Sequence, residues 1–184
     1  MIDLTFITGN QFKADYLAQH LGLPVRHHKL DLDEIQSLDA RVVVEHKVRQ
    51  AYDILHSPVL VEDAGLTLTA MGRLPGTYIK WFMEELGAEG MVRMAAALPS
   101  QEAIATVCFG LYDGGESVRF FEAAMHGRIA DHVDDGTGGF GYAQIFINDG
   151  YEYARSSMTP EEFDRTSQRM AALIKLRSFL TSQQ

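Results

Sequence analysis

Residues 59–66, Val-Leu-Val-Glu-Asp-Ala-Gly-Leu, open the most informative stretch of the sequence, which extends to residue 82. An apolar strand over Val59–Val61 runs directly into two adjacent carboxylates, Glu62 and Asp63. Carboxylates at the carboxyl end of a buried strand lie where α/β proteins place ligands and metals. Mg²⁺ binds through one or two carboxylates together with substrate phosphates, so this strand end is a candidate metal site. Neighbouring side chains of an extended strand point to opposite faces, so we expect only one of the two carboxylates to face a ligand.

Hydrophobic periodicity predicts alternating helices and strands on both sides of this stretch. The expected helices are Gln11–Leu21, Ala40–Leu55, Trp81–Leu98 with a break near 87–90, and a last helix that runs to about Leu180. A capping box at Thr159–Glu162 starts this last helix, and a restart at Ser167 is the alternative. The expected strands are 2–7, 25–30, 59–61, 104–112, 117–124, 128–133 and 142–147. This order predicts one α/β domain over residues 1–184, with a mixed sheet flanked by helices.

Composition excludes several functional classes. The formal net charge is −9, from 16 basic and 25 acidic residues, which argues against a nucleic-acid polymer as partner but not against a small polyphosphate. No apolar run approaches the roughly 18 residues that a membrane span needs, so we expect no membrane association. The single cysteine, Cys108, lies in an apolar run, and we expect a buried residue in a reducing compartment, the cytoplasm. Zinc-ligand spacings and nucleophilic serine or cysteine motifs are missing.

Thr8-Gly9-Asn10 joins the first strand to the first helix. A strand that turns through glycine into a helix exposes backbone N–H groups that favour an anion. Lys13 can add a point charge to a bound phosphate. The alternative is that Gly9 only makes the turn and Asn10 only caps the helix.

An acidic run covers Asp31–Gln36. If Glu34 faces the end of the strand at Asp63, it completes a metal site that would draw in a triphosphate. The alternative is an ordinary solvated loop.

A glycine-rich segment, 136–142, contains two aromatic residues. Phe140 and Tyr142 could stack on a flat base, worth about 1–3 kcal/mol. Gln168 and Arg169 could form hydrogen bonds to a base edge. The alternative for 136–142 is a flexible loop followed by ordinary core aromatics. The alternative for Gln168 and Arg169 is a polar pair that faces solvent.

These motifs occur in one order along the chain: Thr8-Gly9-Asn10 with Lys13, the run 31–36, 61–66, Leu74-Pro75-Gly76 with Lys80, 139–142, Asp149-Gly150, and Ser167 with Arg169. Together they resemble the inosine triphosphate pyrophosphatase family, whose members remove deaminated purine nucleotides. The resemblance implies an elongated mixed β-sheet flanked by helices, with two lobes and a central cleft (ITPase-like or Maf-like). It also implies a homodimer and Mg²⁺-dependent hydrolysis of nucleoside triphosphates to monophosphate and pyrophosphate.

The resemblance implies roles for particular residues. Asp63 would be a metal ligand and the proton acceptor for the attacking water, and Glu34 would be the second metal ligand. The substrate-binding residues would be Thr8, Gly9, Asn10, Lys13, Lys47, Ala64, Lys80, Phe140, Gly141, Tyr142, Gln168 and Arg169.

Three departures from the family pattern fall in the part that reads the base. Ala143, Phe163 and Gln168 stand where the family usually has aspartate, lysine and histidine. A site that loses polar partners for a base discriminates less well, so we expect triphosphate turnover with weakened or redirected preference for inosine. Two alternatives remain open: a nucleotide-binding protein with little turnover, and a pyrophosphatase for a different nucleotide, such as a modified pyrimidine.

Overall fold

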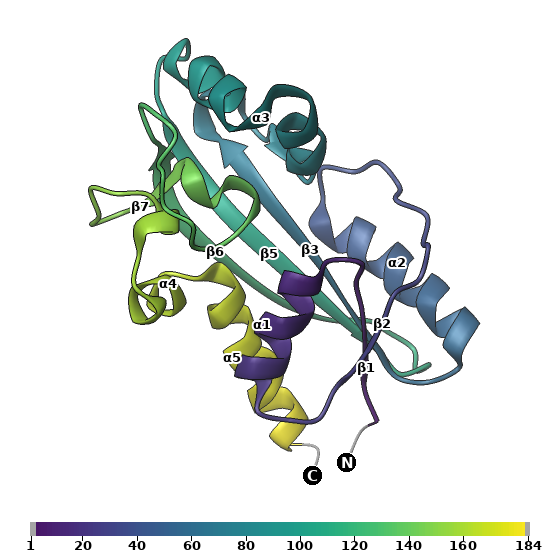
Figure 1. The fold of residues 1–184 in the computed structure, drawn as a ribbon. Coiled ribbons are helices and arrows are strands. Elements are labelled where there is room, and N and C mark those ends of the chain that lie inside the picture. Colours follow the sequence, from purple (N-terminus) through teal and green to yellow (C-terminus); the bar gives the residue numbers. More distant parts are fainter. Residues whose placement is uncertain (1–2, 183–184) are drawn as a thin grey trace. The chain divides into compact units, whose positions relative to one another are not determined.

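The computed structural model describes residues 3–182 (Figure 1). The strands are β1 Thr5–Ile7, β2 Arg26–His28, β3 Val59–Leu68, β4 Pro75–Gly76, β5 Glu102–Tyr112, β6 Arg119–Ile129 and β7 Phe146–Asn148. The α-helices are α1 Gln11–Leu21, α2 Ala40–Leu55, α3 Ile79–Ala96, α4 Pro160–Arg165 and α5 Gln168–Ser182. Three 3₁₀ turns complete the described chain: η1 Thr69–Met71, η2 Gly141–Gln144 and η3 Arg155–Ser157.

The described strands form one mixed sheet in the order β2-β1-β3-β5-β6-β7, with β4 paired to β3. β1 pairs in parallel with β2 and β3, whereas β4 runs antiparallel to β3 and β7 runs antiparallel to β6. The predicted α/β class with a mixed sheet is therefore confirmed. Contacts divide the chain into two compact units. Unit 1 comprises residues up to Asp63, Val107–Ala123 and the chain from Arg169; unit 2 comprises Ala64–Thr106 and Ala124–Gln168.

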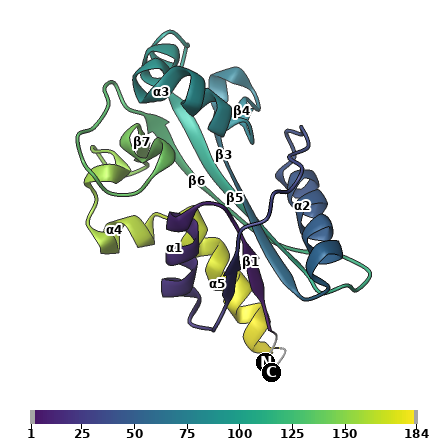
Figure 2. The same ribbon diagram turned by 45° about the vertical axis from the view of Figure 1, so that its right-hand side comes forward.

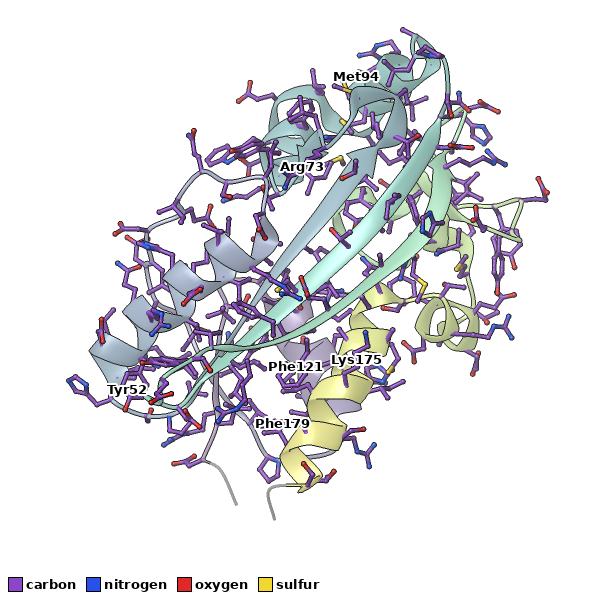
Figure 3. All side chains as sticks on the ribbon, turned by 180° about the vertical axis from the view of Figure 1, so that it is seen from behind. Tyr52, Arg73, Met94, Phe121, Lys175 and Phe179 are labelled. Atoms are coloured by element: carbon purple, nitrogen blue, oxygen red, sulfur yellow. The ribbon has the colours of Figure 1, made fainter. Side chains whose placement is uncertain are left out.

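In unit 1, α1 and α5 lie side by side on one face of the strands, and α2 covers the other face (Figures 1 and 2). Helix α2 has the predicted bounds, because Val44, Val48 and Ala51 recur at helical spacing and are fully buried. They pack against strand residues that include Val59 and Val61. On the α5 side, the rings of Phe121 and Phe179 lie with centroids 5.6 Å apart (Figure 3).

Unit 2 has its own core beneath α3. Leu66, Met91 and Phe146 are fully buried members of this core. The break predicted in the helix is confirmed at Gly87, where φ is 65° and ψ is 178°. That left-handed backbone conformation is one that glycine adopts without steric cost. None of the helices in residues 3–182 combines the length and apolar character that crossing a bilayer requires.

Several expected strands are wrong in part. Residues 141–144 form the 3₁₀ turn η2, so the strand predicted from 142 begins only at Phe146. Gly139 and Gly141 both have positive φ, which interrupts the extended conformation before the strand. The strand predicted over 128–133 is instead the end of β6, which stops at Ile129. The strand predicted over 59–61 continues to Leu68.

Candidate active site

The two adjacent carboxylates of β3 have separate environments within unit 1. The Glu62 side chain is 1% exposed and accepts hydrogen bonds from Arg169 Nε at 2.8 Å and Nη2 at 2.9 Å. Lys13 Nζ lies 3.0 Å from Glu62 Oε1. Burial alone would raise the pKa of Glu62, but attraction to Arg169 and then Lys13, with their hydrogen bonds, holds it at about 2. Glu62 is therefore an ionised link between two cations.

The loop that begins α1 places Lys13 beside Glu62. Thr8 Oγ1 accepts a hydrogen bond from the backbone N–H of Asn10 at 3.1 Å, and Asn10 Oδ1 accepts one from the backbone N–H of Lys13 at 3.2 Å. Asn10 is therefore the N-cap that the sequence allowed as an alternative, and the backbone N–H groups of Asn10 and Lys13 already donate within this loop. The Lys13 side chain as a whole is 17% exposed.

Asp63 faces a second lysine. Its Oδ1 lies 3.7 Å from Lys47 Nζ, and the same ammonium group lies 2.9 Å from Glu34 Oε1. Asp63 Oδ2 is buried and has no hydrogen-bond partner among residues 3–182. Burial raises the pKa of Asp63; attraction to Lys47 and Lys13 opposes this rise, and repulsion from Glu62 and Glu34 adds to it. A carboxylate with a raised pKa and an unused oxygen atom suits a proton acceptor or a metal ligand.

The acidic run is held against α2 by contacts that sequence reasoning missed. The Gln50 side chain accepts from the Asp33 amide at 2.8 Å and donates to Asp33 Oδ2 at 3.1 Å. Gln50 and Lys47 are three residues apart and so share one face of the helix. The run is therefore a loop anchored at two points, and the anchors bring Glu34 to the Lys47 ammonium group. The three-residue spacing between Lys47 and Gln50 is the feature of the sequence that could have indicated this contact.

The donor set fits a Mg²⁺ ion. Among residues 3–182, no three His, Cys, Asp or Glu side chains gather to hold a metal by themselves. Two carboxylates, Asp63 and Glu34, meet at Lys47, and one of them has an unused buried oxygen. One or two carboxylates supplemented by phosphate oxygens are the donor set that Mg²⁺ prefers.

Unit 2 contains a second polar cluster, around Tyr142. The Tyr142 hydroxyl donates to the Gly65 carbonyl at 3.2 Å and accepts from Gln168 Nε2 at 3.0 Å. Gln168 Oε1 accepts from Arg155 Nη1 at 2.9 Å. The Arg155 guanidinium also stacks over the Phe163 ring, 4.3 Å from its centroid. Arg155 belongs to none of the sequence motifs, and no signal in the sequence pointed to it.

The predicted site residues divide between the two units. Lys13, Lys47, Glu34 and Asp63 come together in unit 1 with the Thr8–Asn10 loop. Ala64, Lys80, Phe140, Gly141, Tyr142 and Gln168 belong to unit 2. Lys80 is exposed at the start of α3, with its ammonium group 4.8 Å from the Trp81 ring centroid. Its predicted contact with a phosphate stays a prediction.

Arg169 was predicted to reach a base edge. In the structure its guanidinium is buried, bound to Glu62 in unit 1 and placed 5.6 Å from the Tyr16 ring centroid. Its role toward a base also stays a prediction.

Solved structures with the same fold are Ham1 proteins. A HAM1 protein from Coxiella burnetii has a TM-score of 0.85 and 21% identity, and covers 99% of this chain and 100% of its own. A nucleoside-triphosphatase, or dITP/XTP pyrophosphatase, from Mycobacterium abscessus has a TM-score of 0.75 and 21% identity, with coverage of 95% and 98%.

Sequence comparison extends the likeness from fold to family. A model of the Ham1 family matches residues 4–179. The inosine triphosphate pyrophosphatase of Schizosaccharomyces pombe is 38% identical, covering 98% of this chain and 96% of the relative. Inosine triphosphate pyrophosphatase 2 of Trypanosoma cruzi is 39% identical, with coverage of 95% and 90%. The chain belongs to the Ham1 family.

Proposed function

We propose that this protein is a nucleoside triphosphate pyrophosphatase. It hydrolyses nucleoside triphosphates to the monophosphate and pyrophosphate, with deaminated purines (inosine and xanthosine forms) as its expected substrates. The names of its relatives support the reaction class. The observation that carries the proposal is Asp63, whose buried and unpaired oxygen lies in a carboxylate–lysine cluster.

The residues of unit 1 supply the chemistry of this reaction. Lys13 and the amide groups at the start of α1 would bind phosphate oxygens, and Lys47 would add a second positive charge. Asp63 would accept the proton of the attacking water as the new P–O bond forms. The bond between the α- and β-phosphates breaks, and the electron pair leaves with pyrophosphate.

We propose Mg²⁺ as the cofactor, held by Asp63 and Glu34. When bound, the ion would withdraw electron density from the phosphates and stabilise the charge that develops on them. Burial raises the pKa of Asp63 in the metal-free protein, and a bound cation would oppose this rise.

The test is pyrophosphate release from inosine, xanthosine, guanosine and adenosine triphosphates, with and without Mg²⁺. We expect turnover only with Mg²⁺. Asp63→Asn should reduce kcat by at least about 10³-fold while triphosphate binding persists, because the proton acceptor is lost. Asp53→Asn, at an exposed position on α2, is the matched control. Full activity of Asp63→Asn would contradict the role of Asp63, and nucleotide binding without turnover in the wild type would favour a binding protein.

Base recognition is assigned to the residues around Tyr142 in unit 2. Ala143, Phe163 and Gln168 replace the charged or imidazole side chains usual in the family, so we propose that the preference for inosine is weakened or redirected. The same nucleotide panel, extended to modified pyrimidines, measures this. A strong inosine preference would contradict the proposal.

We also propose a homodimer located in the cytoplasm. In unit 2, Trp81 is 52% exposed and Leu86 is 42% exposed, and such side chains would suit an interface if they form one contiguous apolar patch. Light scattering on the wild type and on Trp81→Ala measures the assembly, and fractionation of cells measures the location.

A further inference from the structure

Arg155 is a buried arginine in a part of unit 2 that carries no family motif. It is 4% exposed and lies in η3. Its Nη1 donates to Gln168 Oε1 at 2.9 Å and to the Thr166 carbonyl at 3.3 Å. Phe163 lies under the guanidinium plane. Two of the three positions at which the chain departs from its family, Phe163 and Gln168, are thus contacts of one arginine.

Arg155 determines the orientation of the Gln168 amide. A guanidinium group can only donate hydrogen bonds, so the atom of Gln168 that faces it must be the carbonyl oxygen. The NH₂ group of Gln168 is then directed at the Tyr142 hydroxyl, 3.0 Å away. The hydroxyl oxygen accepts this bond, and its own hydrogen goes to the Gly65 carbonyl. The series Arg155, Gln168, Tyr142 and Gly65 therefore has one donor direction throughout.

We propose that Arg155 is a positioning residue for base recognition. It acts through Gln168 to set the direction of the hydrogen bonds of Tyr142 and to hold its ring. The inference rests on the proposed function, in which Tyr142 contacts the base. A buried polar series with all its donor directions set accepts one pattern of base groups and rejects others. The discrimination that the family usually assigns to aspartate, lysine and histidine is here carried by an arginine that acts through its hydrogen bond to Gln168.

Substitutions can separate this role from simple packing. Arg155→Met removes the donor and keeps the length of the side chain, which frees the Gln168 amide to turn over. Gln168→Leu removes both bonds of the amide. Gln168→Glu keeps an acceptor for Arg155 but offers Tyr142 no donor, so the Tyr142 hydroxyl must reverse its direction. Arg128→Met is the control, because Arg128 is a surface arginine of the same unit, 3.7 Å from the exposed Glu152.

The experiment measures kcat and KM for inosine, guanosine and adenosine triphosphates, with inorganic tripolyphosphate as a competitive inhibitor that lacks a base. We expect Arg155→Met to raise KM for the preferred nucleotide about tenfold, the effect of one buried hydrogen bond, with kcat changed less than about twofold. Inhibition by tripolyphosphate should not change. Gln168→Leu should match Arg155→Met, and the double variant should be no worse than either, because all three break the same series.

Gln168→Glu distinguishes positioning from stability. Its new ion pair with Arg155 should keep the melting temperature at or above that of the wild type, while the ratio of kcat/KM between inosine and adenosine triphosphates changes by about threefold or more. An unchanged KM and an unchanged nucleotide ratio in Arg155→Met would overturn the inference. An equal loss of tripolyphosphate inhibition in that variant would overturn it as well, since the effect would then not concern the base.

Failure of the proposed function has a different signature. If the wild type releases no pyrophosphate from any nucleotide, calorimetric binding of the same nucleotides and of tripolyphosphate replaces the kinetics. Arg155→Met should then bind the preferred nucleotide about tenfold more weakly and tripolyphosphate unchanged. Equal nucleotide affinity of the variant and the wild type would reject the role of Arg155 in that case too.

Discussion

Glu62 and Asp63 are adjacent in sequence, yet their pKa values are shifted in opposite directions. Both are removed from water, which raises the pKa of a carboxyl group. Glu62 has two close cations and stays ionised to a pH of about 2, whereas Asp63 has a longer contact with Lys47 and an oxygen without a partner. Because successive side chains of a strand point to opposite faces, Glu62 contacts Arg169 and Lys13 whereas Asp63 faces Lys47.

Replacing Glu62 should destabilise the protein strongly. Glu62→Gln leaves the buried guanidinium of Arg169 without its charge partner, a change that typically costs about 3–5 kcal/mol. Urea unfolding at pH 7 measures the loss. Glu45→Gln, which breaks the half-exposed pair with Arg49, is the control and should cost no more than about 0.5 kcal/mol.

The same carboxylate makes stability depend on acid pH. The folded pKa of Glu62 lies below the ordinary value of 4.5. Its contribution is therefore complete above about pH 4.5 and is lost as the pH falls toward about 2. Between pH 5 and pH 2, the free energy of unfolding should fall more steeply with decreasing pH for the wild type than for Glu62→Gln. Equal slopes for the two proteins would contradict this assignment.

Replacing Asp63 should have the opposite effect on the metal-free protein. Because its folded pKa is raised, ionised Asp63 disfavours folding increasingly as the pH rises from 3.8 through the folded value. Asp63→Asn resembles the protonated form, so we expect a higher free energy of unfolding than in the wild type at pH 7. Thermal unfolding in EDTA measures it. Adding Mg²⁺ should stabilise the wild type and leave the variant unchanged, and a destabilised variant in EDTA would oppose the assignment.

Among the helices and strands, those with strong local sequence signals were predicted well. Helix α2 has the expected bounds because its apolar residues repeat at helical spacing. The capping box at Thr159 and Glu162 forms in both directions, as its four residues predict. The turn η2 could not be predicted from periodicity, because its apolar residues suit a strand and only the backbone at Gly139 and Gly141 prevents one.

The loop that carries Glu34 depends on α2 for its position. Gln50→Leu removes both hydrogen bonds to Asp33 without changing a charge. The loop then loses one of its two anchors, so we expect Mg²⁺ affinity to fall about 10-fold, within the range for residues that orient metal ligands. Isothermal titration with Mg²⁺ measures this. Gln11→Leu on α1, whose partner is the exposed Asp15, is a suitable control, and equal affinity for all three proteins would exclude the anchoring role.

At the scale of the whole chain, the order of motifs predicted the family and the class of fold. The sequence did not predict which charged side chains would pair with one another in the folded protein. Arg169 was expected at a base edge, and the structure pairs it with Glu62, a contact that joins residues 107 positions apart. Arg155 was not anticipated, because a single arginine in a loop has no recognisable pattern. Long-range pairing of charges depends on how distant segments pack, and local sequence contains little information about that.

Ligands should stabilise the folded protein by mass action. A nucleotide that binds only the folded state adds RT ln(1 + [L]/Kd), about 2.7 kcal/mol at a hundredfold excess over Kd. We expect the monophosphate product alone, Mg²⁺ alone and a non-hydrolysable triphosphate with Mg²⁺ to raise the melting temperature in increasing order. Differential scanning fluorimetry at fixed protein concentration measures the series. A triphosphate that gives no increase beyond Mg²⁺ alone would argue against the proposed substrate class.

The bond between Glu62 and Arg169 also orders events during synthesis. Lys13 and Glu62 leave the ribosome early, but the guanidinium group that donates two hydrogen bonds to Glu62 is translated more than a hundred residues later. Until α5 emerges, the nascent protein has an acidic side chain that is best left in water, so the first strands cannot close stably around it. A chain that ends before Arg169 should therefore fold less stably than the full chain, and limited proteolysis of the two measures this.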